Sequence, residues 1–210
     1  METVMAGNLA MAAQKAAEIL ARGGVALFPT DTLYCLGADA LSNEAVDAVY
    51  AIKGRNEGKP MHALVADMAM AEKYAEVSDD ARLLAERSPR GKVTFICKRK
   101  KGFDTGICRG IDTFGFRIPD SELCTEILRA YGKPVTATSA NRAGEAPLRS
   151  VEKILEQLGG AAGGIGLVID GGEVPPSEPS TVVDLSGSRP VILREGAVPV
   201  SLVWEALRTE

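Results

Sequence analysis

The sequence predicts an α/β fold in which a twisted, mixed β-sheet is flanked by helices. Apolar stretches of strand length alternate with amphipathic stretches of helix length between residues 8 and 170. Two further strand-like stretches, 180–185 and 190–196, are separated by a short polar turn, which favours an antiparallel pair. No internal repeat and no linker-like segment interrupts the pattern, so we expect a single domain over residues 1–210.

The first half of the chain alternates helices and strands. Asn8–Arg22 places apolar side chains on one helical face, and Gly23-Gly24 marks the end of that helix. The strand that opens at Gly24 breaks at Pro29, because proline cannot donate a hydrogen bond to a neighbouring strand. Ser42 caps a helix that reaches Ile52. The same signals predict a strand at Met61–Ala66, helices at Ala69–Ala75 and Ser78–Arg87, a strand at Lys92–Cys97 and a basic turn at Lys98–Gly102.

The second half continues the alternation and then changes to a hairpin. Phe114–Ile118 alternates as a strand and stops at Pro119, and Glu122–Tyr131 is an amphipathic helix. Further along, the patterns predict a strand at Pro134–Ser139, a helix from Ser150 to Leu158, a flexible connector at Gly159–Gly164, a strand at Leu167–Asp170, the hairpin, and a closing helix at Leu202–Leu207.

The amino-acid composition indicates a globular protein and argues against a membrane protein or a general nucleic-acid binder. Apolar residues make up 46% of the chain and charged residues 25%, which is typical of a globular protein, and no apolar run reaches the length of a membrane span. The net charge of −4 gives no general attraction to nucleic acid. The four cysteines are far apart, and no signal peptide is recognisable, so we expect reduced thiols and a cytoplasmic location. A single histidine, His62, argues against a histidine-based metal centre.

Polar clusters follow the predicted strands and indicate a small-molecule site. They are Thr30–Tyr34, Lys53–Lys59, Thr138–Asn141 and Pro179–Thr181. Arg117 and Arg194 stand on strands between them, each beside apolar residues, where an arginine is costly to bury unless it meets an anion. These cations and hydroxyls suit a ligand that carries phosphate and carboxylate groups. Neither a Walker loop nor a GxGxxG motif occurs, so a nucleotide would be bound in another way.

At these clusters the sequence resembles the YrdC/Sua5 family of threonylcarbamoyl-AMP synthases. The matching segments are Pro29–Tyr34 with Leu36–Asp39, Lys53–Arg55 with Lys59-Pro60, Arg117–Pro119, Ser139–Asn141 with Gly144, Pro179–Asp184, and Arg194–Gly196. They occur in the order that the family shows and extend from about Ala16 to Gly196. The chain ends at Glu210 and so resembles the single-domain YrdC type.

The resemblance implies a YrdC-like fold and an enzyme that makes threonylcarbamoyl-AMP and pyrophosphate from L-threonine, bicarbonate or CO2, and ATP with Mg²⁺. It also implies that the product serves N6-threonylcarbamoylation of adenosine 37 in tRNA, with tRNA and a threonylcarbamoyl-transferase complex as partners. By this likeness the threonine site would consist of Thr32, Tyr34, Arg117, Ser139 and Ser180, and the ATP site of Lys53, Arg55, Lys59, Thr113, Asn141, Arg149 and Arg194. Lys53 and Arg55 would be the catalytic cations, and no general base is implied.

The chain departs from the family pattern at two positions near the expected site. Cys35 stands where the family usually has glycine, and Leu64 stands where many members have histidine, so the role of that histidine is not assigned to His62. Two alternatives stay open. One is a YciO-like paralogue, and the other is a module that binds double-stranded RNA or tRNA through the cationic segments Lys53–Lys59 and Lys98–Lys101.

Overall fold

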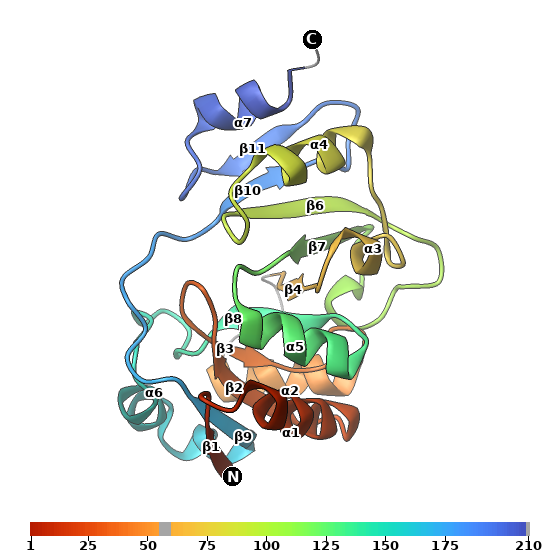
Figure 1. The fold of residues 1–210 in the computed structure, drawn as a ribbon. Coiled ribbons are helices and arrows are strands. Elements are labelled where there is room, and N and C mark those ends of the chain that lie inside the picture. The colour runs from red at the N-terminus through yellow and green to blue at the C-terminus, as the bar shows by residue number, and fades with distance from the viewer. Residues whose placement is uncertain (55–59, 209–210) are drawn as a thin grey trace.

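A computed structural model describes residues 1–54 and 60–208 (Figure 1). Its helices are α1 (Leu9–Ala21), α2 (Asn43–Lys53), α3 (Met68–Ala71), α4 (Asp79–Arg87), α5 (Glu122–Tyr131), α6 (Val151–Leu158) and α7 (Val200–Ala206), with the 3-10 turns η1 (Gly106–Cys108) and η2 (Gly159–Gly164). Its strands are β1 (Glu2–Met5), β2 (Val25–Pro29), β3 (Tyr34–Gly37), β4 (His62–Leu64), β5 (Ala75–Glu76), β6 (Val93–Arg99), β7 (Thr113–Arg117), β8 (Val135–Ser139), β9 (Ile165–Asp170), β10 (Thr181–Asp184) and β11 (Val191–Arg194).

The strands form one mixed sheet, as the sequence predicts. Its order is β1-β9-β2-β3-β8-β4-β7-β6-β10-β11, and β5 pairs with β6 outside this path. Four neighbouring pairs are parallel (β1 with β9, β9 with β2, β4 with β7, β6 with β10), and the other pairs are antiparallel. Strand β8 lies in the middle, where it is antiparallel to both β3 and β4. The sheet therefore joins segments that are far apart in the sequence.

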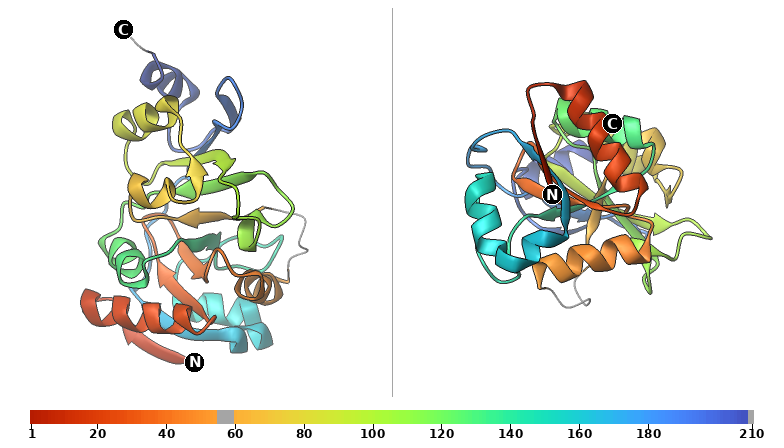
Figure 2. Two further views of the ribbon diagram at one scale, coloured as in Figure 1. Left: turned by 90° about the vertical axis from the view of Figure 1, so that its right-hand side faces the viewer. Right: turned by 90° about the horizontal axis from the view of Figure 1, so that it is seen from below.

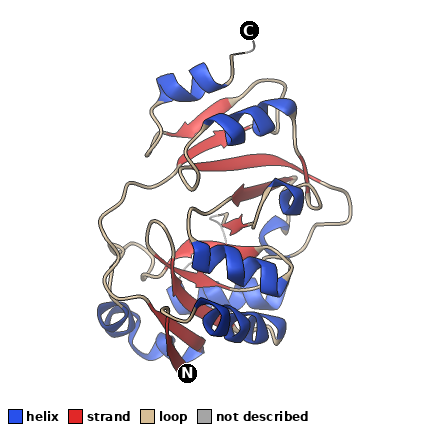
Figure 3. Cartoon of the chain, in the orientation of Figure 1, coloured by secondary structure: helices blue, strands red, loops and turns tan. Residues whose placement is uncertain are grey.

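Helices cover both faces of the sheet at its lower end. Helix α1 packs against α5 on one face, while α2 lies on the other face beside η1 and η2 (Figure 2). At the opposite end, α4 packs against α7 (Figure 3). Serine caps fix where several helices begin, because the hydroxyl of Ser42 accepts the amide hydrogen of Ala45 and that of Ser121 accepts the amide hydrogen of Cys124.

The sheet is longer and more continuous than the sequence suggests. Strands β1, β3 and β5 were not expected, and Ala75, placed at the end of a helix by the sequence, lies in β5. Strand β6 extends to Arg99, so only residues 100–102 remain of the expected basic turn. The expected flexible connector at 159–164 is a 3-10 turn. Within the described residues, no helix has the length and apolar character needed to cross a membrane.

Candidate functional site

A cavity of about 480 Å³ opens where the turn after β2 faces the segment before β10. Its wall combines cationic, hydroxyl and apolar side chains. The lining residues are Thr32, Leu33, Cys35, Pro60, Met61, His62, Arg117, Ala137, Thr138, Ser139, Pro147, Ser177, Glu178, Pro179, Ser180 and Arg194. They come from β3, β8, β4 and β7 in the middle of the sheet and from β11 at one end, so the cavity exists only in the folded chain.

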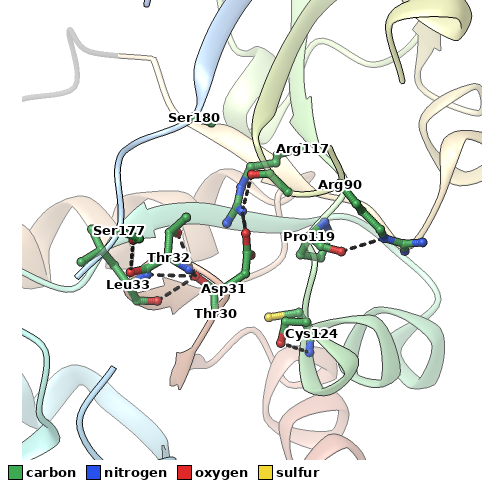
Figure 4. Close-up of polar contacts among 12 residues, drawn as sticks. Thr30, Asp31, Thr32, Leu33, Arg90, Arg117, Pro119, Cys124, Ser177 and Ser180 are labelled. Carbon is green, nitrogen blue, oxygen red and sulfur yellow. Dashed lines mark hydrogen bonds and ion pairs between the residues drawn. The ribbon is translucent and has the colours of Figure 1, made fainter. Parts of the chain in front are cut away.

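The turn between β2 and β3 brings Thr32 to the cavity. Thr30, which is buried, holds this turn from inside, because its Oγ1 accepts the amide hydrogens of Thr32 (3.1 Å) and Leu33 (3.2 Å). The same hydroxyl donates to the carbonyl oxygen of Leu33 at 2.8 Å (Figure 4). Such a hydroxyl-bonded turn replaces the sheet hydrogen bonds that end at Pro29. Thr32 is thereby presented from a fixed backbone.

Arg117 ends β7 at the floor of the cavity and is 5% exposed. Its Nη1 donates to both carboxylate oxygens of Asp31, at 2.7 and 2.8 Å, and to the carbonyl oxygen of Gly91 at 3.1 Å (Figure 4). The side chains of both ion-pair partners are 6% exposed. The requirement that a buried arginine must meet an anion is therefore met within the protein.

Ser180 and Arg194 come from the β10–β11 hairpin region. The hydroxyls of Ser180 and Thr94 lie 2.8 Å apart, and Nη2 of Arg194 donates to the carbonyl oxygen of Ser180 at 2.8 Å. Ser177, earlier in the same segment, donates its hydroxyl to the carbonyl oxygen of Thr32 at 2.7 Å (Figure 4). These contacts tie the segment before β10 to the turn after β2 across the cavity.

Lys53 supports the turn that follows β8. It is 3% exposed, and its Nζ donates to the carbonyl oxygens of Ser139 and Asn141 and to Oδ1 of Asn141 at 3.4 Å. Oδ1 of Asn141 also accepts the hydroxyl of Ser139, and its amide nitrogen donates to two carbonyl oxygens of the following turn. Ser139 lines the cavity, whereas Lys53 and Asn141 lie behind it.

The structure thus brings Thr32, Arg117, Ser139, Ser180 and Arg194 together around one cavity. Other expected residues lie elsewhere. The Tyr34 hydroxyl accepts the amide hydrogen of Gly171 and contacts Gly172, and burial raises the pKa of Tyr34 to about 12. Thr113 begins β7, at the opposite end from Arg117, and Arg149 pairs with Glu173 at 3.7 Å. Arg55 and Lys59 lie outside the described residues.

Several cavity residues were not assigned a role from the sequence. Ser177, Glu178 and His62 belong to this group, and so does Asp31, which lies behind the wall and binds Arg117. The buried position expected for Arg117 was the signal that could have identified Asp31, because it demanded an anionic partner. Cys35 lines the cavity as well, and its burial raises the pKa of its thiol, so it is a neutral, compact part of the wall.

The wall is suited to a small ligand with an anionic end. An arginine at the floor, five hydroxyl side chains along the wall and a second arginine at the rim offer charge-assisted and neutral hydrogen bonds in a partly enclosed space. Because the donors are attached to strand ends and short turns, little conformational entropy is lost when they bind.

Comparison with known proteins agrees with this geometry. The family model for Sua5, YciO and YrdC, described as telomere recombination, matches residues 18–196. The threonylcarbamoyl-AMP synthase of Pyrococcus abyssi is 33% identical over 193 residues, which cover 91% of this chain and 56% of the relative. The chain therefore spans little more than half the length of that relative.

Solved structures show the same fold. The crystal structure of P. abyssi Sua5 complexed with L-threonine matches with a TM-score of 0.87 and 30% identity, covering 98% of this chain and 60% of that chain. The crystal structure of E. coli YciO matches with a TM-score of 0.79 and 26% identity, covering 96% and 97%. Because the family model matches most of the chain, the chain belongs to the Sua5/YciO/YrdC family.

Proposed function

We propose that the protein is an L-threonylcarbamoyladenylate synthase, which makes threonylcarbamoyl-AMP and pyrophosphate from L-threonine, bicarbonate or CO2, and ATP. The observation that carries this proposal is the cavity in which Arg117 lies among the hydroxyls of Thr32, Ser139 and Ser180. An amino acid carries a carboxylate for the arginine, and threonine adds a hydroxyl for the polar wall. The P. abyssi structure with L-threonine supports this choice of substrate.

The chemistry requires positioning and positive charge rather than a covalent nucleophile. The threonine amine attacks CO2 and loses a proton to give a carbamate. A carbamate oxygen then attacks the α-phosphorus of ATP, and pyrophosphate leaves with the electron pair of the broken bond. Arg194 at the cavity rim would balance charge on the phosphates, and the family resemblance adds Arg55 and Lys59 to this role.

Mg²⁺ would accompany ATP as part of the substrate. The described residues contain no group of three or more His, Cys, Asp or Glu side chains that could hold a metal ion. Mg²⁺ that enters with a nucleotide is commonly bound by phosphate oxygens and water, so ATP itself would supply most of its ligands. In this arrangement, Lys53 would serve by holding Ser139 and Asn141 in place.

The product would serve N6-threonylcarbamoylation of adenosine 37 in tRNA, with a threonylcarbamoyl-transferase complex as the acceptor. An activated carbamoyl adenylate hydrolyses readily, so a partner that consumes it directly is expected. The cavity also distinguishes this proposal from an RNA-binding module, since a cavity of this size suits a small molecule, and the net charge is −4.

The test is release of pyrophosphate from ATP by the purified chain. We expect release that requires L-threonine and bicarbonate together and is lost in Arg117→Met. Duplex RNA titrated at two salt concentrations serves as the comparison. Salt-sensitive RNA binding without threonine-dependent release of pyrophosphate would show that the protein is not this enzyme.

A further inference from the structure

The Asp31–Arg117 pair leaves one edge of the guanidinium available. Arginine has five N–H groups in a planar fork, two of them on Nη1. Nη1 is engaged by both oxygens of Asp31 and by the carbonyl oxygen of Gly91. Among the described residues, Nη2 and Nε of Arg117 make no hydrogen bond, and Arg117 lines the cavity. The edge formed by Nε and Nη2 therefore has three N–H groups without an acceptor in the part of the chain that the structure describes.

That edge has the geometry that binds a carboxylate. Two parallel N–H groups, one from Nε and one from Nη2, match the two oxygens of a carboxylate. If the guanidinium rotated about the Cδ–Nε bond, a different edge would face the cavity, and the two parallel N–H groups would no longer meet the two carboxylate oxygens. Both carboxylate oxygens of Asp31 accept hydrogen bonds from Nη1, which prevents this rotation. Asp31 is itself fixed, because it belongs to the turn that the Thr30 hydroxyl holds.

Gly91 leaves room for the Asp31 carboxylate beside Arg117. It has a φ of +77°, and a Cβ atom built there would lie 2.3 Å from Oδ2 of Asp31. Its amide donates to the carbonyl oxygen of Ile118, the residue after Arg117, at 3.1 Å. Gly91 does not line the cavity. A side chain at this position would thus displace the Asp31 carboxylate without entering the substrate space.

We propose that Asp31 is a positioning residue, which holds Nη1 of Arg117 so that the Nε–Nη2 edge binds the carboxylate of the amino-acid substrate. This inference rests on the proposed function, because it names how that substrate is held. It differs from a purely structural role, in which Asp31 only neutralises a buried arginine. In the structural role, loss of the charge on Asp31 lowers stability and leaves the substrate affinity of the folded protein unchanged.

Asp31→Asn tests the proposal, with Asp120→Asn as the matched control. Asp120 is exposed, lies three residues after Arg117, and its side chain makes no hydrogen bond or ion pair among the described residues. We expect Asp31→Asn to raise the KM for L-threonine by about 10- to 100-fold, a size typical of a displaced binding group, while the KM for ATP stays at the wild-type value. Asp120→Asn should leave both unchanged. An unchanged KM for threonine in folded Asp31→Asn would overturn the inference.

Two further variants keep the test decisive if Asp31→Asn folds poorly. Gly91→Ala should also raise the KM for threonine, because it displaces the same carboxylate from outside the cavity. In an Arg117→Lys background, adding Asp31→Asn should cause no further loss, since a positioning residue acts through its partner. Additive losses in the double variant would contradict the proposal.

Failure of the inference and failure of the proposed function can be told apart. Wild-type protein without threonine-dependent release of pyrophosphate contradicts the function. Crystal structures of the wild type and Asp31→Asn then decide the role of Asp31 independently of any substrate. A rotated Arg117 guanidinium in the variant supports the inference, and a guanidinium in the wild-type position overturns it.

Discussion

Lys53 provides a prediction that separates a structural role from direct contact with ATP. The side chain is 3% exposed, and its Nζ donates to the carbonyl oxygens of Ser139 and Asn141. Methionine has a similar length and apolar stem but no hydrogen to donate. Lys53→Met therefore removes the support of the turn after β8 while it preserves the packing at the end of α2.

The expected loss of stability follows from these contacts. Two hydrogen bonds from a charged donor contribute about 3 to 6 kcal/mol together. The variant recovers part of this because a buried ammonium no longer has to be desolvated, which leaves a net loss of about 2 to 4 kcal/mol in the free energy of unfolding. Because Ser139 lines the cavity, the KM for L-threonine should rise as well.

Urea unfolding and steady-state kinetics measure the two effects. Lys153→Met is the control, because Lys153 is exposed on α6 and its side chain makes no hydrogen bond or ion pair among the described residues. A variant with wild-type stability and a raised KM for ATP alone would refute the reasoning. That result would instead assign Lys53 to the ATP phosphates, as the family resemblance implies.

Three further predictions concern stability. Thr181→Val should lower the free energy of unfolding by about 1 to 3 kcal/mol in urea titrations, because the buried Thr181 hydroxyl donates to the carbonyl oxygen of Val198 at 2.6 Å and accepts two amide hydrogens; equal stability would contradict this. Gly106→Ala should lower the free energy of unfolding by more than about 2 kcal/mol, because the new Cβ atom would lie 2.1 Å from a backbone oxygen. Gly110 also has a positive φ but faces open space, so Gly110→Ala should lower the free energy of unfolding by less. Equal losses in the two variants would show that the clash at Gly106 is not the cause. Burial raises the pKa of all four cysteine thiols, so the thiols stay protonated in the folded state. Their contribution to the free energy of unfolding is intact below the unfolded pKa near 9.0 and is lost as the pH rises above it, by up to about 1.4 kcal/mol per pH unit for each thiol. A free energy of unfolding that stays constant from pH 8 to 10 would contradict this.

Local signals in the sequence predicted most helices because their causes are local. Ser42 and Ser78 cap α2 and α4 as expected, and α5 has the bounds that its apolar stripe predicts. The missed strands have no such signal. Strand β1 has one buried residue, and β3 is a four-residue return strand whose place depends on pairing with β2 and β8. Pairing between distant segments is a property of the whole fold.

The sequence predicted which residues line the candidate site better than it predicted which residues contact one another there. Polar clusters at strand ends, joined by the family resemblance, identified Thr32, Arg117 and Ser180, which line the cavity. The sequence could not show that Tyr34 contacts the segment after β9 and lies away from the cavity. Nor could it show that Asp31 engages Arg117, because two segments 86 residues apart meet only when β3, β8, β4 and β7 are side by side.

The origin of the carbamoyl carbon tests the central claim most directly. Purified protein is incubated with ATP, L-threonine and ¹³C-labelled bicarbonate, and the nucleotide products are identified by mass spectrometry. The account predicts threonylcarbamoyl-AMP that carries the heavy carbon, in amounts that match the pyrophosphate released. AMP or ADP formed without a threonine-containing, labelled adenylate would contradict it.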